Sequence, residues 1–198
     1  MWARPVRLEG RLVTLEPLGQ EHVEGLRAAA ADPLVWRWLS TGFDEWLADA
    51  LTQAEDAVFT VLRDGEPVGS TRYLSIAPEH RRLEIGWTWL AREVWGTGAN
   101  TEAKLLLLEH AFEELGALRV EFKTDARNER SRAALAALPA EFEGVFRAHM
   151  LVRDGVRRDS AYYAVIADDW PAVKARLRAR VDAAVARATA SSSLGAGR

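Results

Sequence analysis

A glycine turn holds the residues of this chain that are best suited to chemistry, in the run Trp95-Gly96-Thr97-Gly98-Ala99-Asn100-Thr101. The turn joins a strand-like run over residues 83–90 to a strongly helical run over residues 100–115. Two glycines one residue apart let the backbone turn tightly and come close to a ligand. The free N–H groups and positive dipole end of the following helix point into the turn and favour phosphate. The pattern predicts a site for a phosphorylated cofactor or substrate, although Gly96 and Gly98 could also be ordinary turn residues.

Composition excludes several other kinds of site. The chain has 198 residues, of which 48% are hydrophobic, enough for one α/β domain with a full core. It has no cysteine, which excludes disulfides, cysteine metal sites and a thiol nucleophile. None of the four histidines pairs with another at metal-ligand spacing, so no metal site is expected. A net charge of −3 gives no indication of a nucleic-acid or membrane partner.

The cellular location is predicted from what the sequence lacks. The N-terminus has no apolar segment typical of a signal peptide, and no apolar run is long enough to span a bilayer. We therefore expect a cytoplasmic protein. A P-loop nucleotide site is disfavoured, because no Gly-Lys-Ser or Gly-Lys-Thr follows the turn.

Hydrophobic periodicity and turn residues predict the element order β-α-α-β-β-β-α-β-α-β-β-α. Asp64-Gly65 and Asp154-Gly155 predict two hairpins, so the sheet should be mostly antiparallel. The predicted strands are residues 11–18, 57–63, 67–75, 82–90, 119–124, 142–153 and 157–166, and the predicted helices are 20–31, 44–56, 100–115, 128–138 and 170–187.

The C-terminal region divides into a helix and a tail. We expect a single domain over residues 1–188, which ends in a helix at about 168–188. Residues 189–198 are mostly small and polar, with too little apolar content to offset the entropy of ordering. This tail is predicted to be disordered.

Three segments, in this order, resemble the GNAT acetyltransferase superfamily and, within it, the RimJ/RimL-type N-acetyltransferases. They are Leu83-Glu84-Ile85-Gly86-Trp87-Thr88-Trp89-Leu90, the glycine turn with the residues up to Ala103, and Asp125-Ala126-Arg127-Asn128-Glu129-Arg130-Ser131. The resemblance covers roughly Val6 to Val173. It implies an α/β (α+β) GNAT fold, in which a mixed, mostly antiparallel twisted sheet of about seven strands is flanked by helices, with an extra C-terminal helix.

The same resemblance implies acetyl-CoA as cofactor. Its pyrophosphate would lie on backbone amides from Thr97 to Thr101, and its pantetheine arm along the strand Glu84–Leu90. Asn128 and Ser131 match the family's Asn-x-x-Ser near the sulfur, although they could instead be a helix cap. The implied cofactor-binding residues are Trp87, Trp89, Leu90, Trp95, Gly96, Thr97, Gly98, Ala99, Asn100, Thr101, Asn128 and Ser131.

Two residues are candidates for catalysis. An amine must be neutral to attack a thioester, and Glu84, in the strand expected to border the acceptor site, could accept its proton. Alternatively, Glu84 pairs with an arginine such as Arg72 or Arg82. The leaving thiolate needs a proton or a hydrogen-bond donor, for which Ser131 is the candidate.

The sequence contains no motif for the acceptor site, and only a few side chains are candidates for it. Trp36 and Trp38 could wall an apolar acceptor pocket or could simply belong to the core. One of Arg127, Arg130 and Arg132 could bind the 3′-phosphate, although a solvated helix face is the more common explanation.

Together these observations predict an acetyl-CoA-dependent N-acetyltransferase that acts by direct attack in a ternary complex. The acceptor is a primary amine, either a protein N-terminal α-amine or a small-molecule amine. The alternative is a non-catalytic acyl-CoA-binding module. Exposed tryptophans and the extra C-terminal helix would also fit a homodimer.

Overall fold

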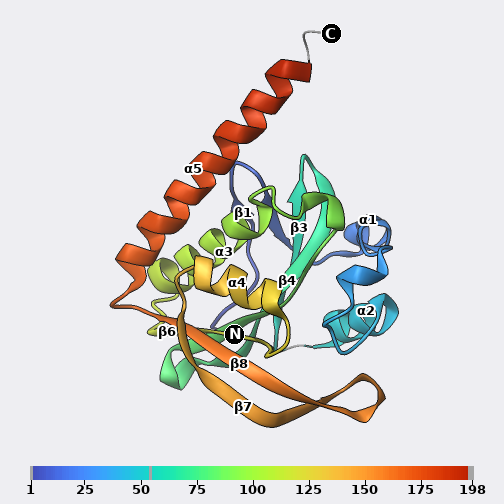
Figure 1. The fold of residues 1–198 in the computed structure, drawn as a ribbon, viewed down its shortest axis with the longest axis vertical. Helices are drawn as coiled ribbons and strands as arrows, with labels where there is room; N and C mark the ends of the chain where they lie inside the picture. Colours follow the sequence, from blue (N-terminus) through green and yellow to red (C-terminus); the bar gives the residue numbers. More distant parts are fainter. Residues whose placement is uncertain (1, 54, 196–198) are drawn as a thin grey trace.

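The computed structural model describes residues 2–53 and 55–195, which form one twisted, open sheet with helices around it (Figure 1). The strand order is β1-β2-β3-β4-β5-β6-β8-β7, and only the pair β5–β6 is parallel. The predicted mixed, mostly antiparallel GNAT sheet is therefore confirmed, with eight strands where about seven were predicted. The strands are β1 Leu8–Glu9, β2 Thr14–Pro17, β3 Ala57–Arg63, β4 Glu66–Ala77, β5 Arg82–Leu90, β6 Arg119–Asp125, β7 Glu141–Val152 and β8 Val156–Ile166. The α-helices are α1 Val23–Ala29, α2 Phe43–Thr52, α3 Ala99–Glu109, α4 Glu129–Ala137 and α5 Trp170–Gly195.

Helices cover both faces of the sheet. Successive side chains of a strand point to opposite faces, so a strand with apolar residues throughout contributes to two cores. On β3, Phe59 and Val61 belong to the core that α3 and α5 complete, whereas Val58 belongs to a second core with α1 and α2. Strand β3 is accordingly buried along almost its whole length, as its continuous apolar run indicates.

The extra strand arises at the N-terminal end of the chain. Where the sequence predicted one strand over 11–18, the chain forms two short strands that pair through Leu8 with Leu15 and Glu9 with Thr14. The connecting turn is held by the buried carboxylate of Glu102 in α3, which accepts hydrogen bonds from the N–H groups of residues 11, 12 and 13 at 2.5–2.9 Å. A long-range contact of this kind has no local sequence signal.

Strands β5 and β6 diverge, and this divergence opens the sheet. They pair only from Arg82 to Glu84, after which β5 remains hydrogen-bonded to β4 alone. Opposite Thr71 of β4, strand β5 is bulged, and Trp87 has a φ of 48°, a value uncommon for a residue other than glycine.

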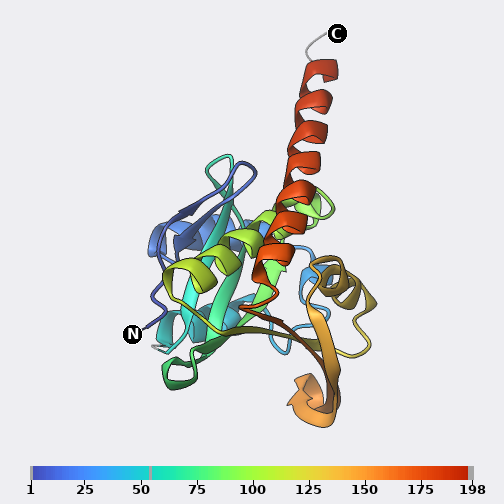
Figure 2. The ribbon, with the colours of Figure 1, turned by 90° about the vertical axis from the view of Figure 1, so that its left-hand side faces the viewer.

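Helix α5 is longer than predicted. It continues to Gly195, past the end expected near residue 188 and through most of the segment predicted to be disordered. The run from residue 183 to 190 is rich in alanine and contains no glycine or proline, which favours continuation of the helix. It packs on α3 and the core as far as Ala184 and Val185, and its last turns extend away from the sheet (Figure 2). The last residues of that predicted tail, 196–198, lie outside the described part of the chain.

Candidate active site

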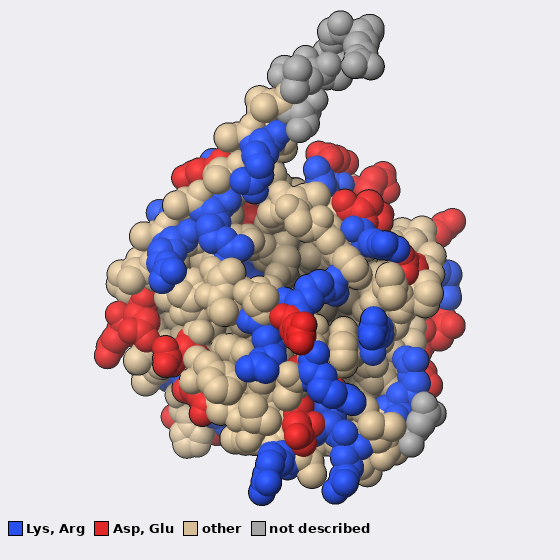
Figure 3. All heavy atoms as spheres, viewed as in Figure 1, with Lys and Arg blue, Asp and Glu red and all other residues tan. Residues whose placement is uncertain are grey.

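A cavity of about 480 Å³ lies where β5 and β6 diverge. Its walls come from β5, β6, the glycine turn, the first turns of α3, helix α4 and the middle of α5. Figure 3 shows this side of the molecule, with Lys and Arg side chains along α5 and over the middle of the face. Of the predicted site residues, those that line the cavity are Trp38, Glu84, Trp87, Trp89, Leu90, Trp95, Gly96, Gly98, Asn100, Thr101, Asn128 and Ser131.

The two glycines of the turn have different surroundings. Gly96 and Gly98 have φ values of 76° and 99°, which favour glycine. A Cβ atom at Gly96 would meet open space, so a ligand can approach the backbone there. A Cβ atom at Gly98 would lie 2.5 Å from the Cβ of Ala184 in α5. Gly96 therefore suits ligand access, whereas Gly98 is also required for packing between α3 and α5.

Two predicted cofactor residues lie outside the cavity lining. The Thr97 hydroxyl donates a hydrogen bond to the carbonyl of Val94 at 2.7 Å, and Ala99 is buried in the core. These side chains stabilise the turn. Their backbone amides remain candidates for the phosphate, because α3 is eleven residues long and its N-terminus opens at this turn.

Asn128 and Ser131 line the cavity and also form the N-terminal cap of α4. The Oδ1 atom of Asn128 accepts a hydrogen bond from the N–H of Ser131 at 3.1 Å, as the helix-cap alternative predicts. The cap uses the backbone of Ser131 and leaves its hydroxyl without a hydrogen-bond partner among the described residues. That hydroxyl is therefore free to donate to a ligand.

Glu84 is buried, with 4% of its surface exposed. Burial raises the pKa of its carboxyl group, and the Lys123 ammonium, 3.2 Å away, opposes that rise. The predicted arginine partners are wrong: Arg72 pairs with Asp49 and Asp56, and Arg82 pairs with Glu121. A carboxylate whose pKa is raised is a stronger base than an ordinary glutamate and is suited to accept a proton from an acceptor.

Lys104, which was not among the predicted site residues, also lines the cavity. Its ammonium lies 2.6 Å from the Thr88 hydroxyl and 3.3 Å from that of Thr71, at the bulge in β5. Burial lowers the pKa of Lys104 to about 7. A sequence signal existed, since Lys104 shares one helical face with Leu107, Leu108 and Ala111 and is the only charged residue of that set.

The two candidate tryptophans occupy different environments. Trp36 lies in the second core, where its indole N–H donates to the carbonyl of Ala30 at 2.9 Å and its ring centroid lies 5.2 Å from that of Trp89. Trp36 is therefore a core residue, as the alternative prediction stated, and it does not line the cavity. Trp38 does line it, half-buried, with the Arg127 guanidinium 5.8 Å from its ring centroid.

The basic side chains near the cavity come partly from α5. Among the three predicted arginines, only Arg130 lines it, with its guanidinium 3.5 Å from the ring centroid of Trp95. Arg180 and Arg187 of α5 line it as well, a contribution that sequence reasoning missed because α5 is distant in the chain. Since guanidinium groups bind phosphate, the open glycine turn and these arginines fit a phosphorylated cofactor.

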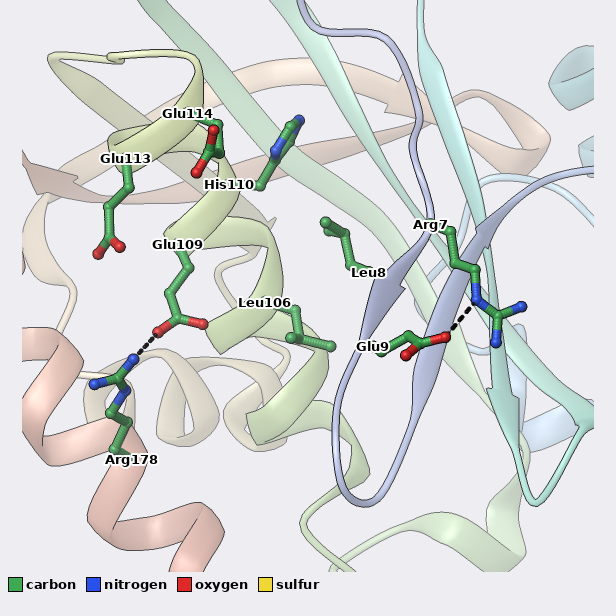
Figure 4. Close-up of a pocket in the computed structure, with 9 residues that line it drawn as sticks. All are labelled: Arg7, Leu8, Glu9, Leu106, Glu109, His110, Glu113, Glu114 and Arg178. Atoms are coloured by element: carbon green, nitrogen blue, oxygen red, sulfur yellow. Dashed lines mark hydrogen bonds and ion pairs between the residues drawn. The ribbon is translucent and has the colours of Figure 1, made fainter.

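A second cavity, of about 370 Å³, lies between β1 and α3 (Figure 4). Three of its four carboxylates are used by ion pairs: Glu9 pairs with Arg7 at 2.7 Å, Glu109 with Arg178 at 2.7 Å, and Glu113, in the π-helical turn that follows α3, with Lys174 at 2.6 Å. The last two pairs fasten α5 to α3 and to that turn, so this cavity has a structural explanation. In the described part of the chain, no cluster of His, Cys, Asp or Glu could hold a metal ion, and no helix is long and apolar enough to cross a membrane.

Comparisons with known proteins agree with this geometry. Residues 12–140 match the family described as the acetyltransferase (GNAT) domain. A solved structure of an acetyltransferase from T. thermophilus is 44% identical, with a TM-score of 0.84 over 91% of this chain and 99% of that one. The structure of Mycobacterium smegmatis RimJ in complex with CoA-disulfide is 25% identical, with a TM-score of 0.72 over 88% of this chain and 92% of that one.

A curated relative from Bacillus subtilis (strain 168), "Putative ribosomal N-acetyltransferase YdaF", is 33% identical over 114 residues. The match spans 58% of this chain and 61% of that relative, so it covers about three fifths of each. The family match covers more than half of the chain and includes β5, the glycine turn and α4. This chain therefore belongs to the GNAT acetyltransferase family.

Proposed function

We propose that the protein transfers the acetyl group of acetyl-CoA to a primary amine by direct attack in a ternary complex. The observation that carries this proposal is the buried carboxylate of Glu84 at the point where β5 and β6 diverge. The acceptor is either a protein N-terminal α-amine or a small-molecule amine. The name of the B. subtilis relative, "Putative ribosomal N-acetyltransferase YdaF", favours a protein acceptor.

The two ends of the cavity have different roles in this proposal. The backbone amides of the glycine turn, with Arg130 and Arg180, bind the phosphates of acetyl-CoA. Strand β5 beyond Glu84 lacks a neighbour on the β6 side, so the pantetheine arm can lie along that free edge. The thioester is then directed toward Glu84, with Asn128 and Ser131 beside it.

Glu84 and Ser131 carry the proton steps. Glu84 accepts the proton of the acceptor ammonium, which leaves a neutral amine with a free electron pair. The amine nitrogen forms a bond to the thioester carbon, and the carbon–sulfur bond breaks. The nitrogen then loses its second proton, which passes through the Ser131 hydroxyl to the thiolate, so the products are the amide and the free thiol of CoA. The protonated Glu84 returns its proton to the solvent. The chain contains no cysteine to carry an acetyl group, so a single transfer step is consistent with its residues.

A two-part assay tests this proposal. The protein, with acetyl-CoA, is offered short peptides with free N-termini and a panel of small amines. Released thiol is followed in solution, and acetylated products are identified by mass spectrometry. Acetyl-CoA binding by calorimetry without thiol release from any acceptor would instead support a non-catalytic acyl-CoA-binding module.

A further inference from the structure

Arg158 of β8 lines the acceptor end of the cavity, and no carboxylate of the described residues lies within ion-pair distance of its guanidinium. Its guanidinium makes neither a hydrogen bond nor an ion pair with any described residue, and its Nε atom is buried without a partner. An arginine withdrawn from water without a hydrogen-bond partner loses hydration, and the carboxylates of Asp125 and Glu84, which are not in contact with it, offset that loss only in part. Such a side chain indicates a site for an anionic group that is supplied from outside the chain.

The neighbouring charges are already used in pairs. Glu84 pairs with Lys123 at 3.2 Å, and Asp125 pairs with Arg127 at 2.8 Å. In addition, Asp125 accepts a hydrogen bond from the backbone N–H of Arg127 at 2.9 Å. Both carboxylates therefore already have a cationic partner, and Arg158 adds a positive charge to this end of the cavity.

Strand register places Arg158 on the acceptor side rather than the phosphate side. Asp125 of β6 lies opposite Ser160 of β8, and Lys123 lies opposite Tyr162. Arg158 alternates with Ser160 and Tyr162 along β8, so it shares their face of the sheet. Arg158, Asp125 and Glu84 all line the same cavity. The glycine turn and α5, which supply the phosphate-binding residues, form the opposite wall.

We propose that Arg158 binds an anionic group of the acceptor, so that the preferred acceptor is a primary amine with a carboxylate close to it. The guanidinium group matches a carboxylate in planar, two-point hydrogen bonding. An amino acid supplies both groups, and so does a peptide with an acidic residue next to its free N-terminus. This inference rests on the proposed transfer to an amine, with Glu84 as the group that receives the proton.

Matched acceptor pairs test the proposal and separate the two sources of the carboxylate. The first pair is L-alanine and L-alaninamide, and the second is the C-terminally amidated peptides Ser-Asp-Ala and Ser-Asn-Ala. In each pair a neutral amide replaces the carboxylate, and kcat/KM is expressed per neutral amine, because this replacement also lowers the pKa of the α-amine of alanine. Steady-state kcat/KM is measured for the parent, for Arg158→Gln and for Arg157→Gln. Arg157 is the matched control, because it is exposed on the same strand and does not line the cavity.

The parent should prefer the carboxylate acceptor in at least one pair. Arg158→Gln should lower kcat/KM for that acceptor about 10- to 100-fold, the usual effect of one charge-assisted contact. Its activity on the neutral acceptor, and its affinity for CoA by calorimetry, should stay within about twofold of the parent. Arg157→Gln should resemble the parent on all four probes.

Several results would overturn the inference. Acetylation of both members of each pair with equal efficiency would remove the carboxylate subsite while leaving the transfer to amines intact. Weaker CoA binding by Arg158→Gln would place the arginine at the cofactor instead. If no probe is acetylated, the proposed transfer itself is in doubt, and calorimetric titration of the same probes into the CoA-bound protein decides the role of Arg158. Equal heats for the parent and Arg158→Gln would then contradict it.

Discussion

The Nζ atom of Lys123 lies 3.2 Å from the Oε2 atom of Glu84, across the parallel strands β6 and β5. Burial raises the pKa of Glu84, and this ion pair limits the rise. A general base must be deprotonated to act, so activity should fall as the pH drops through a pKa above the ordinary value for glutamate. The pair thus sets the lower pH limit of the proposed reaction.

Substitutions in this pair should change the pH dependence of turnover. Glu84→Gln should lower turnover about 10²-fold, which is the rate factor that a positioned general base usually contributes. CoA binding should stay nearly unchanged. Lys123→Met removes the charge that favours the carboxylate, so the pKa of Glu84 should rise and the acid limb of the pH–rate profile should move to higher pH. Lys174→Met is the control, because it breaks glutamate–lysine pairs that lie outside the cavity lined by Glu84. An unshifted limb in Lys123→Met would mean that Glu84 is not the titrating base.

Substitution of the first turn glycine tests the phosphate site without disturbing the packing. Gly96→Ala adds a methyl group where the space is open to a ligand, at a φ of 76°. Gly65→Ala is matched, because its Cβ would also meet open space at a φ of 86°, but in a hairpin turn outside the cavity. Each change should cost about 1 kcal/mol of stability from backbone strain.

Only Gly96→Ala should weaken CoA binding, which we expect to fall at least about tenfold, as calorimetry can measure. Equal CoA affinities in the two variants would contradict the assignment of the turn. Gly98→Val is a poor substitute, because its side chain would collide with Ala184 and separate α3 from α5.

The two tryptophans near α2 should respond differently to truncation. Trp36→Ala removes a buried ring from the second core, so it should cost about 3–5 kcal/mol of unfolding free energy. Trp38→Ala acts on a half-buried ring that lines the cavity, so it should raise the acceptor KM and leave the acetyl-CoA KM unchanged. Denaturant unfolding and two-substrate kinetics separate the cases. Unchanged kinetics in a folded Trp38→Ala variant would remove Trp38 from the acceptor site.

Lys104 should make stability depend on pH. Its pKa is about 7 in the folded protein, below the usual 10.5, so the unfolded chain binds more protons between these values. Stability should therefore rise with pH over this range, by up to about 1.4 kcal/mol per pH unit. When the unfolding free energy is measured in urea from pH 6 to 9, the Lys104→Met variant should lack this rise with pH. Lys174→Met should keep it, because Lys174 has a raised pKa and stays protonated in this range. Parallel stability curves for the parent and Lys104→Met would show that Lys104 stays charged when buried.

The sequence alone determined most of the elements and indicated the glycine turn as a candidate phosphate site. The strands, the helices and the hairpin at Asp64-Gly65 follow from the period of apolar residues and from turn residues, because backbone geometry imposes both locally. The glycine turn was also a local signal, since Gly96 and Gly98 adopt the positive φ values that their positions require. Resemblance to a family then connected this turn with acetyl-CoA.

The tertiary structure decided which side chains meet. Lys123 rather than an arginine pairs with Glu84 because β5 and β6 lie side by side in parallel, and no spacing in the sequence specifies that register. Arg158 reaches the same end of the cavity from β8, and Arg180 reaches the other end from α5. Local patterns depend on backbone angles and hydrophobicity over a few residues. Charge partners depend on how distant elements pack, which is settled only when the whole core is buried.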